Sequence, residues 1–168
     1  FLSFTADGAR VEGDGVFAQR LRLMATRPDF EIIASRDISL ELDVEPSAAI
    51  RLAGAIQRRG GATVELGELT AGIYEAPLQI QVQSTRGYVV GMVSENQGKL
   101  ALGQSGWNVP YAIVLDGVRY DLKEPASIRV GRTREGTDRY GMVFDIGEVE
   151  GARSGRYTDV ITISVQPM

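Results

Sequence analysis

The stretch ISLELDV, residues 38–44, indicates the fold class of this 168-residue chain more clearly than any other segment. Its apolar and polar residues alternate, with Ile38, Leu40, Leu42 and Val44 in one set and Ser39, Glu41 and Asp43 in the other. A period of two places each set on its own face of an extended strand, whereas a helix needs apolar residues three and four apart. The segment therefore predicts a β-strand with one buried face.

The same alternation recurs toward the C-terminus. In LQIQVQ, residues 78–83, three aliphatic residues alternate with three glutamines. We expect further strands over 47–53, 62–66, 77–84, 87–94, 110–116, 118–122, 127–131, 139–149 and 156–166. Gly-containing turns separate them, and Asp116-Gly117 is a good two-residue hairpin candidate. Short strands at roughly ten-residue spacing predict an all-β fold, an immunoglobulin-like antiparallel β-sandwich, with a β-barrel as the structural alternative.

One segment near the N-terminus fits two kinds of element. In 16–26, VFAQRLRLMAT, the residues Phe17, Leu21 and Met24 would share a helix face. A strand would instead group Phe17, Leu21 and Leu23, and we favour the strand.

Composition removes most catalytic chemistry. The chain contains no His and no Cys, which excludes histidine-dependent triads, proton shuttles and metal sites held by these side chains. Its 18 Lys and Arg oppose 22 Asp and Glu, a net charge of −4 that does not suit a nucleic-acid partner. The carboxylates do not follow calcium-loop spacing, and no apolar run reaches the roughly 20 residues that span a bilayer. We therefore predict a protein that is not an enzyme, with no cofactor, metal site, nucleic-acid partner or membrane span.

Two regions carry residues with a possible binding role. Trp107 lies in a Gly-flanked stretch and could stack on a sugar ring, while Arg132 and Arg134 could bind an anionic group. The ordinary interpretations are a Trp packed across the end of a sandwich and arginines that are solvated hairpin charges. Near the last strand, Tyr157 follows a Gly-containing loop, a context similar to the tyrosine corner of sandwich folds.

Several motifs together suggest a family. SGRYTDVITISVQ at the C-terminus, preceded by a Gly-rich loop, resembles the ending of the spore coat protein U domain, the pilin family of archaic chaperone-usher pili. The segments 62–72, 78–100 and 109–117 resemble successive upstream parts of that domain, so the resemblance covers roughly 38–166. Many family members carry a disulfide near the first strand. Here the matching neighbourhood is Ser47-Ala48-Ala49, which has no Cys.

The resemblance implies an incomplete sandwich that a strand from the next subunit completes. It implies a donor strand at 37–45, with Ile38, Leu40, Leu42 and Val44 as the inserting residues, and a pilin-like sandwich over 46–168. The acceptor groove would be edged by the last strand, through Tyr157, Ile161, Ile163 and Val165. Residues 1–36 have no counterpart and are an N-terminal arm or extra strands.

The function implied is that of a structural subunit of a surface fibre, exported through the periplasm and assembled by donor-strand complementation. Its partners would be neighbouring pilus subunits, a periplasmic chaperone and an outer-membrane usher. The residues themselves leave two alternatives open. The strand 38–44 could instead fold within its own sandwich, in a monomer that binds carbohydrate or another surface ligand. The chain could also be a periplasmic assembly factor that holds such subunits.

Overall fold

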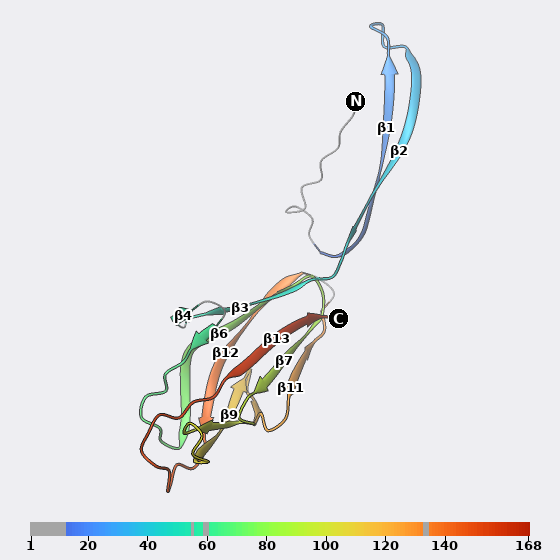
Figure 1. The fold of residues 1–168 in the computed structure, drawn as a ribbon. Helices are drawn as coiled ribbons and strands as arrows, with labels where there is room; N and C mark the ends of the chain where they lie inside the picture. The colour runs from blue at the N-terminus through green and yellow to red at the C-terminus, as the bar shows by residue number, and fades with distance from the viewer. Residues whose placement is uncertain (1–12, 55, 59–60, 133–134) are drawn as a thin grey trace.

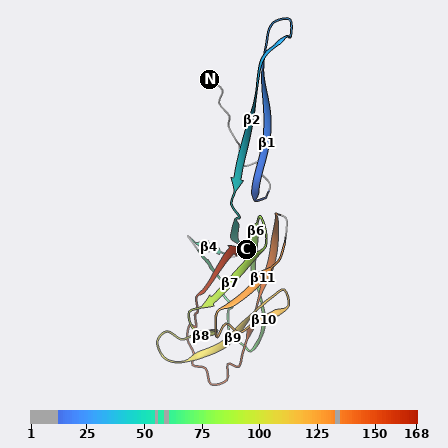
Figure 2. The same ribbon diagram turned by 90° about the vertical axis from the view of Figure 1, so that its right-hand side faces the viewer.

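The computed structural model describes residues 13–54, 56–58, 61–132 and 135–168, and every element in these ranges is a β-strand. A sandwich forms the body, and a long hairpin projects from one end of it (Figures 1 and 2). All strand pairs are antiparallel. The predicted all-β sandwich of immunoglobulin-like type is confirmed. The described residues contain no helix that is long and apolar enough to cross a membrane.

Two unequal sheets make up the sandwich. The larger has β10 (Val118–Tyr120), β9 (Asn108–Leu115), β12 (Gly136–Ile146), β6 (Gly72–Ser84) and β3 (Ala48–Ala53) in this order, with β8 (Lys99–Ala101) paired to β9. The smaller has β11 (Ala126–Val130), β7 (Tyr88–Ser94) and β13 (Ile161–Pro167). A separate short pair joins β4 (Ile56–Arg58) to β5 (Gly61–Thr63). Thus β3 and β13 are edge strands, one in each sheet.

The core lies between the sheets, because the inward residues of facing strands alternate with polar residues that face water. The alternation of 78–83 places Leu78, Ile80 and Val82 in the core, each at most 5% exposed. The other fully buried side chains come from β7, β9, β12 and the segment after β10: Tyr88, Val90, Met92, Val109, Tyr111, Ile113, Leu115, Leu122, Met142, Phe144 and Ile146. No residue of the hairpin belongs to this cluster, so the body has its own core.

Local turn chemistry agrees with the sequence at the β9–β10 hairpin. Asp116 and Gly117 both have positive φ, 50° and 77°, and Leu115 pairs with Val118 across them. Positive φ at both central residues defines the type I′ turn, which matches the twist of paired strands. The predicted two-residue hairpin is confirmed.

Some predicted strand limits are wrong. The segment 62–66 leaves its strand after Thr63, and 156–160 is a loop, so that β13 begins only at Ile161. In the second case the backbone is drawn out of the sheet because Asp159 turns its carboxylate toward other elements of the sandwich end. The segment 16–26 is a strand, as favoured, and not a helix.

The projecting hairpin pairs β1 (Gly15–Thr26) with β2 (Ile32–Val44). Residues directly opposite each other share a face. One face is apolar, because Phe17 lies opposite Leu42 and Leu21 lies opposite Ile38. The other face carries the ion pair of Arg22 and Asp37, with Arg22 Nε 2.7 Å from Asp37 Oδ1.

Both ends of the hairpin are attached to one turn of the body, between β6 and β7. Before β1, Asp14 forms an ion pair with Arg86 of this turn, which holds the pKa of Asp14 below its usual value. After β2, the Ser47 amide donates to Thr85 Oγ1 at 3.0 Å, and the Thr85 amide donates to the Ser47 carbonyl at 3.1 Å. The adjacent residues Thr85 and Arg86 thus hold the base of the hairpin.

Candidate functional site: a groove between two edge strands

A large groove opens beside the core between β3 and β13. Its volume is about 1540 Å³, beyond the roughly 300–1,000 Å³ typical of small-molecule pockets. Ile50 and Leu52 line it from β3, and Ile161 and Ile163 line it from β13. All four are partly buried and pack against the core cluster. The groove therefore has apolar walls where the edges of the two sheets face it.

The outer edge of β13 borders this groove. Among the described residues β13 pairs with β7 and with no other strand. An edge strand presents unpaired N–H and C=O groups and can accept another strand. Since β13 has seven residues at about 3.3 Å each, its free edge is about 23 Å long, and residues 161–163 of this strand line the groove.

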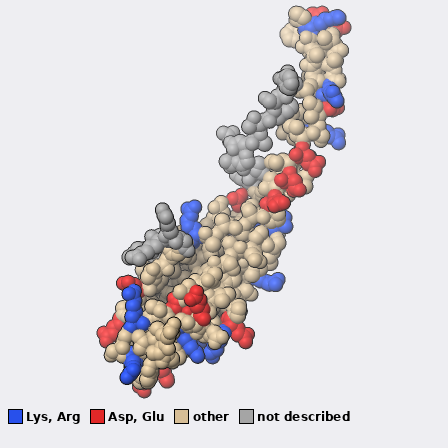
Figure 3. All heavy atoms as spheres, in the orientation of Figure 1, with Lys and Arg blue, Asp and Glu red and all other residues tan. Residues whose placement is uncertain are grey.

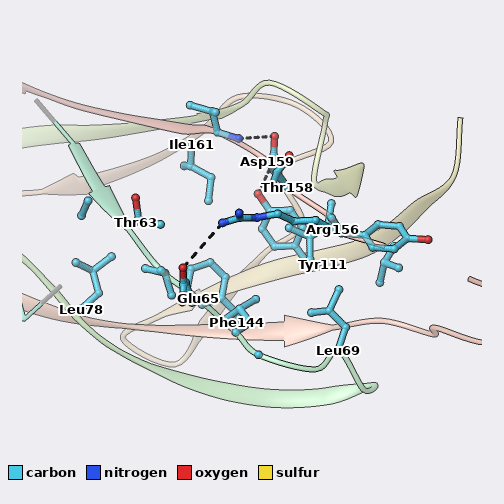
Figure 4. A pocket seen from close by; sticks show the side chains of 18 of the residues that line it. Thr63, Glu65, Leu69, Leu78, Tyr111, Phe144, Arg156, Thr158, Asp159 and Ile161 are labelled. Atoms are coloured by element: carbon cyan, nitrogen blue, oxygen red, sulfur yellow. Dashed lines mark hydrogen bonds and ion pairs between the residues drawn. The ribbon is translucent and has the colours of Figure 1, made fainter. Parts of the chain in front are cut away.

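Core residues such as Leu78, Tyr111 and Phe144 also line the groove, and two loops form much of its remaining wall (Figure 4). One follows β5 and includes Val64, Glu65 and Leu66; the other, residues 149–160, precedes β13. Arg156 of the second loop reaches across to Glu65 of the first, with Nη2 3.9 Å from Oε1, and both side chains are about four-fifths exposed. An exposed pair at this distance contributes little stability, so it does not hold the groove shut.

Tyr157 fixes the second loop as a tyrosine corner does. Its Oη donates to the Arg153 carbonyl four residues upstream, at 2.9 Å. This is the backward bond expected at this position. Deeper in the same end, Asp159 accepts hydrogen bonds from Ser94 Oγ and Tyr111 Oη, both at 2.5 Å. Burial, with this contact, raises the pKa of the Tyr111 hydroxyl well above its usual value.

Three of the four residues predicted for the acceptor edge line this groove: Tyr157, Ile161 and Ile163. Val165 lies farther along β13, half-buried against the core and outside the groove lining. Residues Ile50 and Leu52 of the opposite wall were missed. The alternation in 47–53 was visible, but sequence does not say that its inner face borders an opening.

The four residues predicted for the donor strand lie in β2, outside the sandwich of their own chain. Ile38, Leu40, Leu42 and Val44 share one face of the hairpin with Phe17, Leu21 and Leu23 of β1. Leu42 is 37% exposed and Phe17 42%, while the other members of this set are partly buried. We call these seven residues the apolar hairpin face. The β1 members were missed as functional candidates, although their strand pattern was recognised.

Charges are unevenly distributed over the hairpin. Acidic side chains gather where it approaches the body, in the orientation of Figure 3. In the sequence, Glu41 and Asp43 lie at this end of β2, and Glu45 follows it. Uncharged atoms cover much of the hairpin between its tip and its base (Figure 3).

The residues predicted for a ligand loop are not brought together. Trp107 lies near the Ser94 end of β7, and Arg132 lies near the Tyr88 end, about 20 Å away. Arg132 is engaged internally, in an ion pair with Asp138 and over the Tyr88 ring at 5.3 Å. Arg134 lies outside the described residues.

Trp107 has a different arginine as its neighbour. The guanidinium carbon of Arg153 lies 6.0 Å from the centre of the Trp107 ring. The indole is 43% exposed. An exposed Trp beside a cation offers a flat apolar surface next to a hydrogen-bond donor. In the described residues, His, Cys, Asp and Glu form no cluster that could hold a metal ion.

Comparisons with known proteins bear on the fold. No family model matches the chain, and no curated protein matches its sequence. A chain in the crystal structure of the CsuC-CsuE chaperone-tip adhesion subunit pre-assembly complex, from archaic chaperone-usher Csu pili of Acinetobacter baumannii, is similar with a TM-score of 0.51. The two are 14% identical, and the match covers 92% of this chain and 60% of that one.

A chain from the chaperone-tip adhesin complex of CFA/I fimbriae gives a TM-score of 0.48 at 14% identity, covering 95% of this chain and 55% of that one. The present chain thus spans somewhat over half the length of either. At this identity the Csu likeness concerns the fold: an antiparallel sandwich like those of chains found in chaperone-usher complexes. The spore coat protein U resemblance stays a prediction.

Proposed function

We propose that this protein is a structural subunit of a surface fibre, in which β2 of one copy fills the groove of the next. One observation carries the proposal. The same chain has an apolar groove beside an edge strand and, outside its sandwich, a strand whose apolar residues alternate. Strand addition needs both features. The edge strand forms backbone hydrogen bonds with the added strand, and the groove receives its alternating apolar side chains.

The lengths of the two strands agree. The segment 38–44 and the strand β13 each have seven residues, so each is about 23 Å long. Complete burial of an aliphatic side chain contributes about 1.5–3 kcal/mol, and four such side chains alternate along 38–44. Backbone hydrogen bonds along the edge of β13 would add to this stability.

The likeness to a chain of the Csu pilus complex supports a role in pilus assembly. On this proposal the partners are neighbouring fibre subunits, a periplasmic chaperone and an outer-membrane usher. The protein would pass through the periplasm and end in a fibre at the cell surface. No catalytic step is part of the proposal, since the chain's work is folding coupled to assembly.

The test is self-association of purified protein, followed by light scattering after size exclusion and by negative-stain electron microscopy. We expect Leu40→Asp and Leu42→Asp to reduce polymer at least tenfold, because a carboxylate cannot enter an apolar groove. Ser39→Asp is the matched control, since it adds the same charge to the opposite face of β2. Equal polymer in all variants would exclude β2 as the donor.

A mixing experiment separates the two surfaces. A groove variant, Ile163→Asp, should fail to polymerise alone but still present an intact hairpin. Mixed with Leu42→Asp, which retains its groove, it should form dimers that stop at one contact. The proposal would be overturned if the mixture of the two variants stayed monomeric and wild-type protein also failed to associate.

The Trp107–Arg153 pair favours a second candidate, binding of a carbohydrate ligand by a monomer. This candidate predicts glycan-array binding that Trp107→Ala abolishes, in a protein with no self-association. A third outcome would be a stable complex with a foreign pilus subunit and no polymer, which would identify a periplasmic assembly factor.

A further inference from the structure

The two sheets of the sandwich differ in width. The larger sheet has five strands in one row, and the smaller has three. Because neighbouring strands lie about 4.8 Å apart, the smaller sheet is about 10 Å narrower than the sheet it covers. The groove lies on the β13 side of the smaller sheet, so strands added at this edge would widen the smaller layer, and two added strands would give it the same number in a row as the larger one.

The hairpin is such a two-stranded unit. Its strands pair from Gly15–Val44 to Ala25–Ala34 without a break. The apolar hairpin face continues from β2 onto β1, where Phe17, Leu21 and Leu23 extend it sideways. A strand that inserted alone would leave these three residues without the neighbours they have in the hairpin, at a cost in buried apolar area.

The opposite face of the hairpin is suited to remain in water. Arg22 donates through Nε to Asp37 Oδ1 at 2.7 Å and through Nη2 to Asp37 Oδ2 at 3.1 Å. This bidentate pair joins β1 to β2, and both side chains are about three-fifths exposed. Glu41 lies on the same face, opposite Ala18. Hence one face of the hairpin suits a sandwich interior and the other suits its exterior.

We propose that the β1–β2 hairpin of one copy docks as an intact two-stranded ribbon into the groove of a second copy, with β2 paired to β13 and β1 outside it. The inference rests on the proposed function and specifies its donor. Of the two strands β2 is the inner one, because its inward residues are all aliphatic over 38–44, whereas β1 has Gln19 among them. The docked hairpin would bring the smaller sheet to five strands.

The absence of cysteine in this chain allows a direct test. Arg20 and Ser39 lie opposite each other on the hydrophilic face, so Arg20→Cys with Ser39→Cys can form a disulfide that locks β1 to β2. The full-length double variant is assayed for polymer in its oxidised and reduced forms. We expect the two forms to polymerise to within about twofold of each other.

Loss of polymer only in the oxidised form, restored by dithiothreitol, would show that β2 must separate from β1. This result would overturn the proposal that the hairpin docks intact, but not the proposal that the protein is a fibre subunit. Failure of wild-type protein to associate would overturn the fibre subunit itself. If neither the oxidised nor the reduced double variant polymerises under conditions in which wild-type protein does, the comparison is repeated with Ala18→Cys and Glu41→Cys, the next opposed pair on the hydrophilic face.

A second measurement addresses β1 directly. In the locked background, Leu21→Asp should reduce polymer at least tenfold, because Leu21 would face the groove. Thr26→Asp is its control, since it adds the same charge to the same strand at the hairpin's far end. The disulfide keeps both variants paired as hairpins. Equal polymer in these two variants would exclude β1 from the contact.

Discussion

At the scale of single residues, Asp159 holds three parts of the sandwich together where the groove opens. Its carboxylate accepts hydrogen bonds from Ser94 Oγ and Tyr111 Oη at 2.5 Å, and from the Asn96 amide at 3.0 Å. Ser94 and Tyr111 are buried, so neither hydroxyl has water as a substitute partner. Removing the carboxylate would leave two buried donors unsatisfied.

We therefore expect Asp159→Ala to lower the free energy of unfolding by about 3 kcal/mol, measured by urea denaturation at pH 7. Glu150→Ala, a change of an exposed carboxylate in the same loop, should stay within about 0.5 kcal/mol of wild type. Similar losses in the two variants would mean that the loop, and not this network, determines the effect.

Two tyrosines make the stability of the body depend on pH in the alkaline range. Burial raises the pKa of both the Tyr88 and the Tyr111 hydroxyl. In the unfolded chain both ionise near pH 10, while the folded state still holds the protons. Their contribution to stability is therefore complete below about pH 10 and is lost as the pH rises toward the folded pKa values.

The free energy of unfolding should fall between pH 10 and 11.5 by up to about 1.4 kcal/mol per pH unit for each tyrosine. Tyr88→Phe should make this fall about half as steep, because one of the two groups is gone. Urea titrations at a series of pH values measure the slope. An identical slope in the variant would show that Tyr88 does not take part.

At the scale of elements, the β6–β7 turn determines where the hairpin points. Arg86 of this turn pairs with Asp14 before β1, and Thr85 bonds to Ser47 after β2. We expect Arg86→Ala to widen the range of hairpin orientations, because one of the two attachments is lost.

Pulsed electron spin resonance can measure this range, with single cysteines introduced at the exposed positions Met24 and Gln166. The distance distribution should become about twofold broader in Arg86→Ala. Arg22→Ala is the control, because it removes an ion pair within the hairpin and none at its base. An unchanged distribution in Arg86→Ala would mean that the Ser47 contacts alone orient the hairpin.

Sequence predicted individual strands well where one face is buried and the other wet. The alternation in 78–83 located β6, and the Asp116-Gly117 pair located the β9–β10 hairpin, because period and turn type are local properties. The loop at 156–160 was misread as strand, since Asp159 and its distant hydrogen-bond partners Ser94 and Tyr111 override the local pattern.

The candidate site was predicted only in part, for a physical reason. The apolar face of 38–44 is visible in the sequence, but alternation does not name a strand's partner, so its pairing with β1 was not foreseen. The groove depends on how far β3 and β13 lie apart, which no local pattern encodes. Trp107 and Arg132 were grouped as loop residues, although the fold holds them at opposite ends of β7.

At the scale of the whole molecule, the body and the hairpin are energetically separate. All residues of the core cluster, including the half-buried ones, lie between Ala48 and Val165. We therefore expect a variant that lacks residues 1–46 to fold, with a melting temperature within about 4 °C of wild type. Near-ultraviolet circular dichroism checks its tertiary packing, and size exclusion should find no polymer. A variant with native secondary structure but no tertiary signal would contradict this independence.

The attachment of the hairpin at Ser47 also bears on conformational entropy. Only Glu45 and Pro46 lie between the end of β2 and this anchored residue. Proline fixes its own φ and restricts the residue before it to extended backbone, so few torsions of the joint remain soft. Each subunit thus loses most of the joint's freedom when it folds, before it meets a neighbour. Association then begins with a preorganised arm, and the entropy cost of docking is correspondingly small.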